Sequence, residues 1–107
     1  MEVIFMINQL TNEQFEEFME SFNDTPVWLK VLCGTVNLDV YYPEFEFLIF
    51  TEIGKYQFGH LNYDEENNYQ NIIIKMDDIE SIHISSIFDD EITLLMCNGI
   101  EIILGLN

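Results

Sequence analysis

The sequence predicts an α+β fold in which one N-terminal amphipathic helix packs on a curved antiparallel β-sheet of about five to seven strands. Two observations predict this fold. One stretch near the N-terminus has apolar residues at helical spacing, and most of the remainder consists of short β-branched and aromatic runs separated by turn residues. A length of 107 residues is typical of one domain, so residues 1–107 are expected to form a single domain.

The helix is predicted to begin at Asn12. Thr11 and Gln14 have the spacing of a capping box, and Leu10 and Phe15 have that of a hydrophobic staple. Four apolar residues then define one helix face: Phe15, Phe18, Met19 and Phe22. Four glutamates occupy the other side: Glu13, Glu16, Glu17 and Glu20. Repulsion among these glutamates costs roughly 1–2 kcal/mol in total. Burial contributes about 1.5–3 kcal/mol per apolar side chain, so the helix is expected to form.

Strands are predicted on both sides of the chain's midpoint. After the helix, which residues 23–26 end, come VWLKVL, VNLDVYY and EFEFLIFTEI. In the third run one face is expected to face the core: Phe45, Phe47, Ile49 and Ile53. Residues 54–62 are predicted to return as a strand after a turn at Gly54. Residues 2–7 fit either a strand or an irregular lead-in.

Residues 71–106 contain four more β-rich runs, NIIIKM, SIHISSI, ITLLMC and IEIILGL. Asn98-Gly99 predicts a hairpin with a two-residue type I′ turn, which would place Cys97 opposite Ile100. One face of this hairpin would hold Leu95, Ile100, Ile102 and Leu104, and the other Ile92, Leu94, Met96 and Ile103. Apolar residues on both faces indicate that the hairpin is central in its sheet.

The charge excludes one class of function. Twenty Asp and Glu residues stand against three lysines and no arginine, which gives a formal charge of −17. Such a surface repels phosphates, so direct binding to nucleic acid is not expected. Adaptation to high salt is an alternative origin of the charge, but nine phenylalanines do not suit a salt-adapted composition.

The N-terminus lacks a basic segment of the signal-peptide type, and no apolar run approaches the length of a membrane span. A cytoplasmic location is therefore expected. In that compartment Cys33 and Cys97 are expected to be buried free thiols rather than a disulfide.

No catalytic signature is recognisable, so the protein is not expected to be an enzyme or to bind a cofactor. Residues 64–68 and 89–91 are rich in carboxylates, but neither matches the spacing of a calcium-binding loop. His60 and His83 have no second ligand at zinc-binding spacing, and His83 is expected to be an exposed or half-buried strand residue. No metal site is predicted.

In size, acidity, lack of arginine and helix-plus-sheet plan, the chain resembles the small acidic inhibitors made by phages, among them anti-CRISPR and other DNA-mimic proteins. The resemblance implies a non-enzymatic inhibitor whose partner is a basic nucleic-acid-binding protein, such as a CRISPR effector nuclease. An immunity protein or antitoxin that caps a basic toxin is an alternative. An acidic accessory or structural subunit is another.

On this hypothesis the partner-binding residues are acids on loops and at strand ends: Asp64, Glu65, Glu66, Asp77, Asp78, Glu80, Asp89, Asp90 and Glu91. The helix glutamates Glu13, Glu16, Glu17 and Glu20 form a second candidate surface. Exposed aromatic residues would add anchors that exclude water, and Tyr63, Tyr69, Tyr41 and Tyr42 are the candidates.

Overall fold

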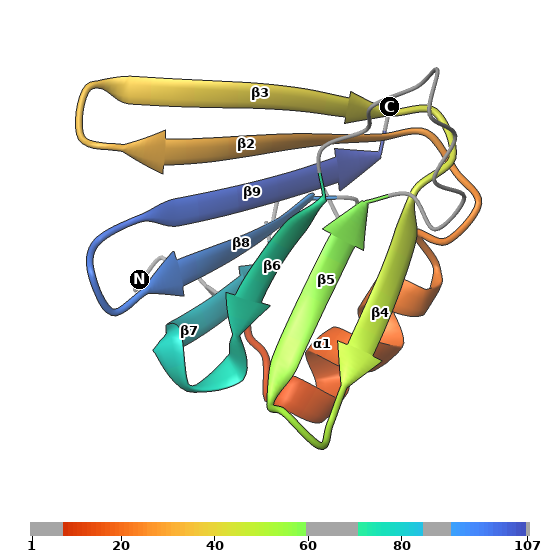
Figure 1. Ribbon diagram of the computed structural model, residues 1–107, viewed down its shortest axis with the longest axis horizontal. Helices are drawn as coiled ribbons and strands as arrows, with labels where there is room; N and C mark the ends of the chain where they lie inside the picture. The colour runs from red at the N-terminus through yellow and green to blue at the C-terminus, as the bar shows by residue number, and fades with distance from the viewer. Residues whose placement is uncertain (1–7, 60–70, 85–90, 107) are drawn as a thin grey trace, which may run out of the picture.

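The computed structural model describes residues 8–59, 71–84 and 91–106, and the account below is restricted to them. Within these ranges the protein has one α-helix and two antiparallel β-sheets (Figure 1). The predicted α+β class is confirmed. The prediction of one sheet of about five to seven strands is wrong, because nine strands divide into two sheets.

The larger sheet, named sheet A here, has the strand order β1-β7-β8-β9-β2-β3. Its strands are β1 (Asn8–Gln9), β7 (Ile79–Ile84), β8 (Glu91–Met96), β9 (Glu101–Leu106), β2 (Val27–Cys33) and β3 (Val36–Tyr42). β1 has only two residues, so the other five strands form most of the sheet. The β8–β9 hairpin lies in the middle of this order, as predicted.

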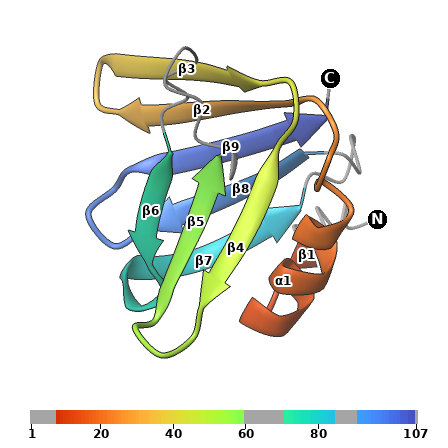
Figure 2. The same cartoon turned by 45° about the vertical axis from the view of Figure 1, so that its right-hand side comes forward.

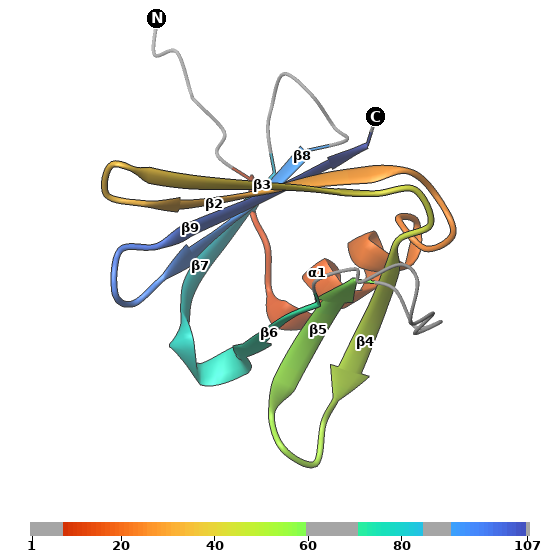
Figure 3. The ribbon, with the colours of Figure 1, turned by 45° about the horizontal axis from the view of Figure 1, so that its top comes forward.

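The smaller sheet, named sheet B, has the order β4-β5-β6. Its strands are β4 (Glu46–Phe50), β5 (Lys55–Gly59) and β6 (Ile72–Lys75). A short 3-10 helix, η1 (Met76–Asp78), follows β6 and leads directly into β7, so the chain crosses from sheet B to sheet A here. Sheet B lies across one face of sheet A (Figure 2), and helix α1 (Asn12–Glu20) lies on the same side (Figure 3).

The start of the helix is as predicted. Helix α1 begins at Asn12, and the backbone N–H of Gln14 donates to Thr11 Oγ1 at 3.2 Å. The Gln14 side chain accepts from the Thr11 N–H at 2.9 Å, which completes the capping box. The helix ends at Glu20, so Phe22 contributes to the core from the turn that follows it.

The core lies between the two sheets and the helix. Phe15 of α1 has its ring centroid 5.5 Å from that of Phe47 on β4, and 5.3 Å and 6.3 Å from those of Tyr56 and Phe58 on β5. Sheet A contributes apolar side chains from five of its strands: Val27, Leu29, Tyr42, Ile82, Ile92, Leu94, Met96, Ile102 and Leu104. Aromatic rings from α1 and sheet B are therefore buried against aliphatic residues of sheet A.

The β8–β9 turn differs from the prediction by one residue. Met96 pairs with Ile100, since the Met96 N–H donates to the Ile100 carbonyl at 2.8 Å, and Cys97, Asn98 and Gly99 form the loop. Gly99 has a φ of +86°, and three-residue hairpin loops often use such a left-handed residue. A shift of one residue exchanges the faces of a strand, so Ile100, Ile102 and Leu104 share the core face with Leu94, and Leu95 does not.

Two further side chains were assigned to the wrong environment. Ile53 is 62% exposed because residues 51–54 form the turn between β4 and β5, so the strand alternation ends before it. Phe45 and Phe47 are buried as predicted, whereas Ile49 is 38% exposed.

Candidate acidic interaction surface

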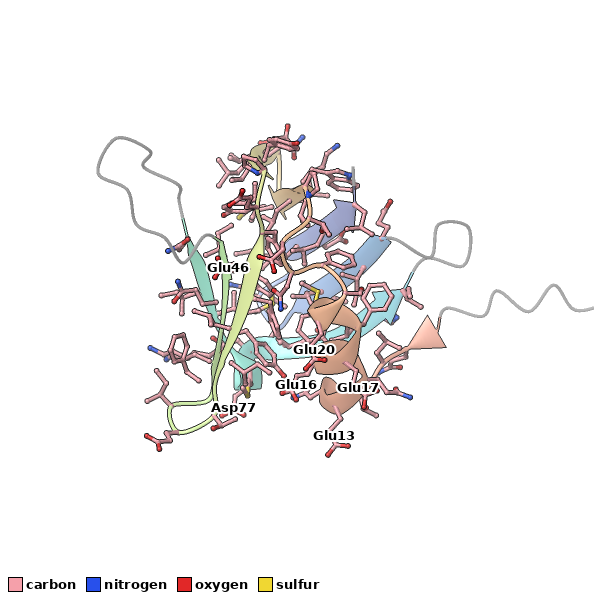
Figure 4. The ribbon with its side chains drawn as sticks, turned by 90° about the vertical axis from the view of Figure 1, so that its right-hand side faces the viewer. Glu13, Glu16, Glu17, Glu20, Glu46 and Asp77 are labelled. Atoms are coloured by element: carbon pink, nitrogen blue, oxygen red, sulfur yellow. The ribbon has the colours of Figure 1, made fainter. Side chains whose placement is uncertain are left out.

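The largest group of described acids on one element lies on helix α1. Glu13, Glu17 and Glu20 are exposed, and Glu16 is half-buried. We name these four residues the helix acid face. Figure 4 shows them together on one side of the molecule, flanked by Glu46 from β4 and Asp77 from η1. The helix carries no basic residue, so its own sequence does not neutralise these charges.

Glu16 differs from its three neighbours because it is bound to the core. The hydroxyl of Tyr56 donates to Glu16 Oε1 at 3.0 Å, and Tyr56 itself is fully buried. Burial raises the pKa of Tyr56, and the hydrogen bond to Glu16 and the negative charge of Glu16 raise it further. Tyr56 therefore stays protonated and holds the Glu16 carboxylate in place, while Glu13, Glu17 and Glu20 extend into solvent.

Two acids that the sequence did not single out extend this surface. Asp24, in the turn after the helix, has a φ of +62°, and its N–H donates to the carbonyl of Phe45 at 2.8 Å. The Phe47 N–H donates to Asn23 Oδ1 at 2.8 Å, which fixes the same turn against β4. Asp24 and Glu46 consequently line one shallow depression of about 290 Å³. These contacts join residues more than twenty positions apart, so no local sequence pattern predicts them.

A second group of predicted acids lies where the chain passes from sheet B to sheet A. Asp77 and Asp78 of η1 and Glu80 of β7 are exposed. The carbonyl of Asp78 accepts from the Cys97 N–H at 2.8 Å, which fixes η1 to the β8–β9 turn. Glu80 lies at an irregularity in the pairing of β7 with β8. Glu91 is half-buried at the start of β8.

The other predicted residues lie outside the described ranges. These are Asp64, Glu65, Glu66, Asp89 and Asp90 among the acids, and Tyr63 and Tyr69 among the aromatic residues. Their role in binding a partner stays a prediction.

The three lysines do not lie on the helix acid face. Lys55 of β5 and Lys75 of β6 are directly paired across the two strands. Side chains alternate between the faces of a strand, so Lys55 points to the side of sheet B opposite Tyr56, which contacts Phe15 of the helix. Lys30 of β2 has its Nζ 5.6 Å from the centroid of the Trp28 ring.

The two tyrosines at the end of β3 have opposite environments. Tyr41 is 50% exposed, which suits a contact residue. Tyr42 is fully buried beside Phe45, so its assignment as an exposed anchor is wrong. Strand alternation accounts for the difference, since neighbouring residues point to opposite faces of the sheet. Burial raises the pKa of Tyr42 to about 12.

The two cysteines and His83 are described by the structure. Cys33 and Cys97 are free, as predicted, but both are exposed rather than buried, because each lies at a hairpin turn. His83 is half-buried on β7, with Nε2 2.8 Å from Ser81 Oγ. No group of three or more His, Cys, Asp or Glu residues in the described part of the chain is arranged to hold a metal ion.

Among the described residues no helix is long and apolar enough to cross a membrane. Comparisons of the chain with protein families, with curated proteins and with solved structures found no match.

Proposed function

We propose that the protein is a non-enzymatic inhibitor that binds the basic nucleic-acid-binding surface of a target protein, with carboxylates in the place of phosphates. One observation carries the proposal: four glutamates without a basic neighbour on their helix, in a chain of formal charge −17. A CRISPR effector nuclease is one fitting target, because its basic channel holds nucleic acid through the backbone. Such a complex would form in the cytoplasm.

The geometry of a helix supports this use of the acids. Residues at i and i+4 lie one above the other with a rise of about 6 Å. This rise is on the order of the separation of successive phosphates, which a 3.4 Å axial rise and the winding of the strand produce. Glu13 and Glu17 form one such pair, and Glu16 and Glu20 form another.

The electrostatics of this surface favours a role in binding over a role in catalysis. A surface of one sign attracts a complementary partner and speeds its association. Catalysis at phosphate requires positive groups that stabilise developing negative charge, and the charged side chains of helix α1 are all carboxylates. The helix acid face therefore suits the recognition of arginine and lysine side chains.

The test compares two variants of equal charge. The acid-face variant carries Glu13→Gln, Glu17→Gln and Glu20→Gln, and it keeps Glu16 because Tyr56 depends on it. The control variant carries Asp39→Asn, Glu52→Gln and Glu101→Gln. Each variant loses three negative charges, so both change the formal charge from −17 to −14.

Immobilised wild-type protein is expected to retain nucleic-acid-binding proteins from a bacterial lysate, and excess duplex DNA or RNA is expected to release them. The acid-face variant should bind the captured protein at least about tenfold more weakly than the control variant does. Equal loss in the two variants would show that only net charge matters and would remove the helix from the interface. Retention of one partner that nucleic acid does not displace would favour an immunity protein or antitoxin.

A further inference from the structure

A groove with apolar walls lies between the two sheets, and no residue of helix α1 is part of its lining. We name it the inter-sheet groove. It has a volume of about 360 Å³. Its lining from sheet A and the β8–β9 turn is Val31, Met96, Asn98, Ile100 and Ile102, and its lining from β6 and η1 is Ile72, Ile73, Ile74, Lys75 and Asp78. Seven of these ten residues are apolar, so the groove suits an apolar occupant.

The groove follows the backbone edge of β6. All four residues of this strand, Ile72–Lys75, line the groove, although alternate side chains point to opposite faces of sheet B. β6 is the last strand in the order β4-β5-β6, and β5 is its only strand partner within the described residues. Alternate N–H and C=O groups of β6 therefore point into the groove, where another strand is able to pair with them.

Sheet A provides a wall that continues past the groove. Val31 of β2 pairs with Leu38 of β3, and Cys33 pairs with Val36, so these residues share the core face of sheet A. Leu38 is nevertheless 45% exposed and Val36 is 66% exposed. The cause is visible in Figures 1 and 2, where the β2–β3 hairpin extends beyond sheet B. A strand added to β6 would lie under this part of the hairpin.

We propose that the inter-sheet groove binds a basic amphipathic β-strand of the target protein, which pairs with β6. Its apolar side chains would contact Val31, Leu38 and Ile102, and its lysines or arginines on the other face would approach Asp77 and Asp78. The proposal rests on the proposed function and specifies an anchor of the complex, which the acids alone do not provide.

Charge selects this occupant over two others. A second copy of the chain also has a formal charge of −17, so close approach of two copies is opposed by repulsion. An anionic lipid is opposed for the same reason. A strand with apolar residues on one face and cations on the other is attracted by the surface and removes apolar area from water.

Two peptides of about seven residues with capped termini serve as probes. One alternates Val and Lys, and the other alternates Ser and Lys with the same charge. The Val-Lys peptide is expected to bind the wild-type protein at least about tenfold more tightly than the Ser-Lys peptide, because only the former fills the groove. The Val-Lys peptide should also slow hydrogen exchange at the β6 amides that point away from β5, and the Ser-Lys peptide should not.

The matched variants use the two faces of β3. The double variant Val36→Thr, Leu38→Thr should remove most of the difference in affinity between the two peptides, because it removes apolar surface from the groove side. Asn37→Thr, on the other face of the same strand, should leave the difference in affinity unchanged. Fluorescence of Trp28 checks that each variant is folded.

The failures of the two proposals have different signatures. Equal affinity for the two peptides would overturn the groove proposal and leave the proposed function intact. Binding of neither peptide would contradict both, since a basic partner would then have no affinity for the protein. Concentration-dependent dimerisation that Leu38→Thr abolishes would assign the groove to a second copy and overturn the proposal.

Discussion

At the scale of single residues, Gly105 is defined by a close contact rather than by backbone conformation. It lies on β9 directly opposite Trp28 of β2, and a Cβ added to it would overlap the indole ring. A glycine inside a strand often marks such an approach. The Trp28 ring therefore lies over the backbone of β9, and the Lys30 ammonium lies 5.6 Å from the ring centroid in a cation–π contact.

We expect Gly105→Ala to lower the free energy of unfolding by about 1–3 kcal/mol, because the indole has to move. Urea denaturation followed by circular dichroism measures this change, because Trp28 is the only tryptophan in the chain and the comparison background lacks it. In a Trp28→Val background the same alanine should cost much less. An equal cost in both backgrounds would show that the backbone of β9, and not the ring, excludes a side chain.

The two buried tyrosines predict how stability responds to alkaline pH. Burial raises the pKa of Tyr42 from 10.0 to about 12, and the pKa of Tyr56 is raised as well. In the unfolded chain both ionise near pH 10, while in the folded protein they keep their protons. The unfolded state then binds fewer protons, so the stabilisation is complete below pH 10 and is lost as pH rises toward the folded pKa.

The free energy of unfolding is therefore expected to fall between pH 10 and about pH 12, with a slope of at most about 1.4 kcal/mol per pH unit for each tyrosine. Tyr42→Phe and Tyr56→Phe should each reduce this slope, and Tyr41→Phe, which changes an exposed hydroxyl, should not. Denaturation with urea at several pH values measures it. A slope unchanged in both buried variants would contradict the argument.

At the scale of elements, short sequence patterns predicted the features that depend on interactions between residues close in the chain. The capping box gave the first residue of α1, because Thr11 and Gln14 satisfy each other's backbone N–H groups within one turn. The four β-rich runs of residues 71–106 became β6, β7, β8 and β9. The β8–β9 loop was wrong by one residue, since the Asn-Gly pair is compatible with loops of two or three residues and only pairing across the hairpin decides between them.

The division into two sheets was not predictable from these signals. β6 and β7 are separated only by η1, yet β6 pairs with β5 and β7 pairs with β8. The sequence of a strand does not specify which strand it pairs with. Packing of the whole chain determines the partner. The same reasoning applies to the candidate surface: the helix glutamates were found from periodicity, whereas the roles of Asp24, Glu46 and the Tyr56–Glu16 hydrogen bond depend on long-range contacts.

At the scale of the whole molecule, the net charge opposes folding. Seventeen uncompensated charges surround a chain with a radius of gyration of 14.1 Å. The Debye length is about 30 Å at 10 mM salt and about 8 Å at 150 mM, so self-repulsion acts across the molecule only at low salt. A surface kept in this state despite its cost is consistent with a role in recognition.

The melting temperature is consequently expected to rise by several degrees between about 10 mM and 150 mM sodium chloride. The variant with Glu13, Glu17 and Glu20 changed to Gln should melt at a higher temperature than the wild type at low salt, and its rise with salt should be smaller. Differential scanning calorimetry measures both quantities. A melting temperature independent of salt would show that repulsion is not a significant cost.

The pairing of β2 with β9 also has a consequence for how quickly the protein acquires its structure. These strands are joined residue by residue, from Val27 with Leu106 to Leu32 with Glu101, across most of the length of the chain. Closing so long a loop costs entropy before its contacts form, so topologies of this kind fold slowly, in milliseconds to seconds. During synthesis, β2 and β3 cannot join the rest of sheet A until β9, which lies between β8 and β2, has left the ribosome.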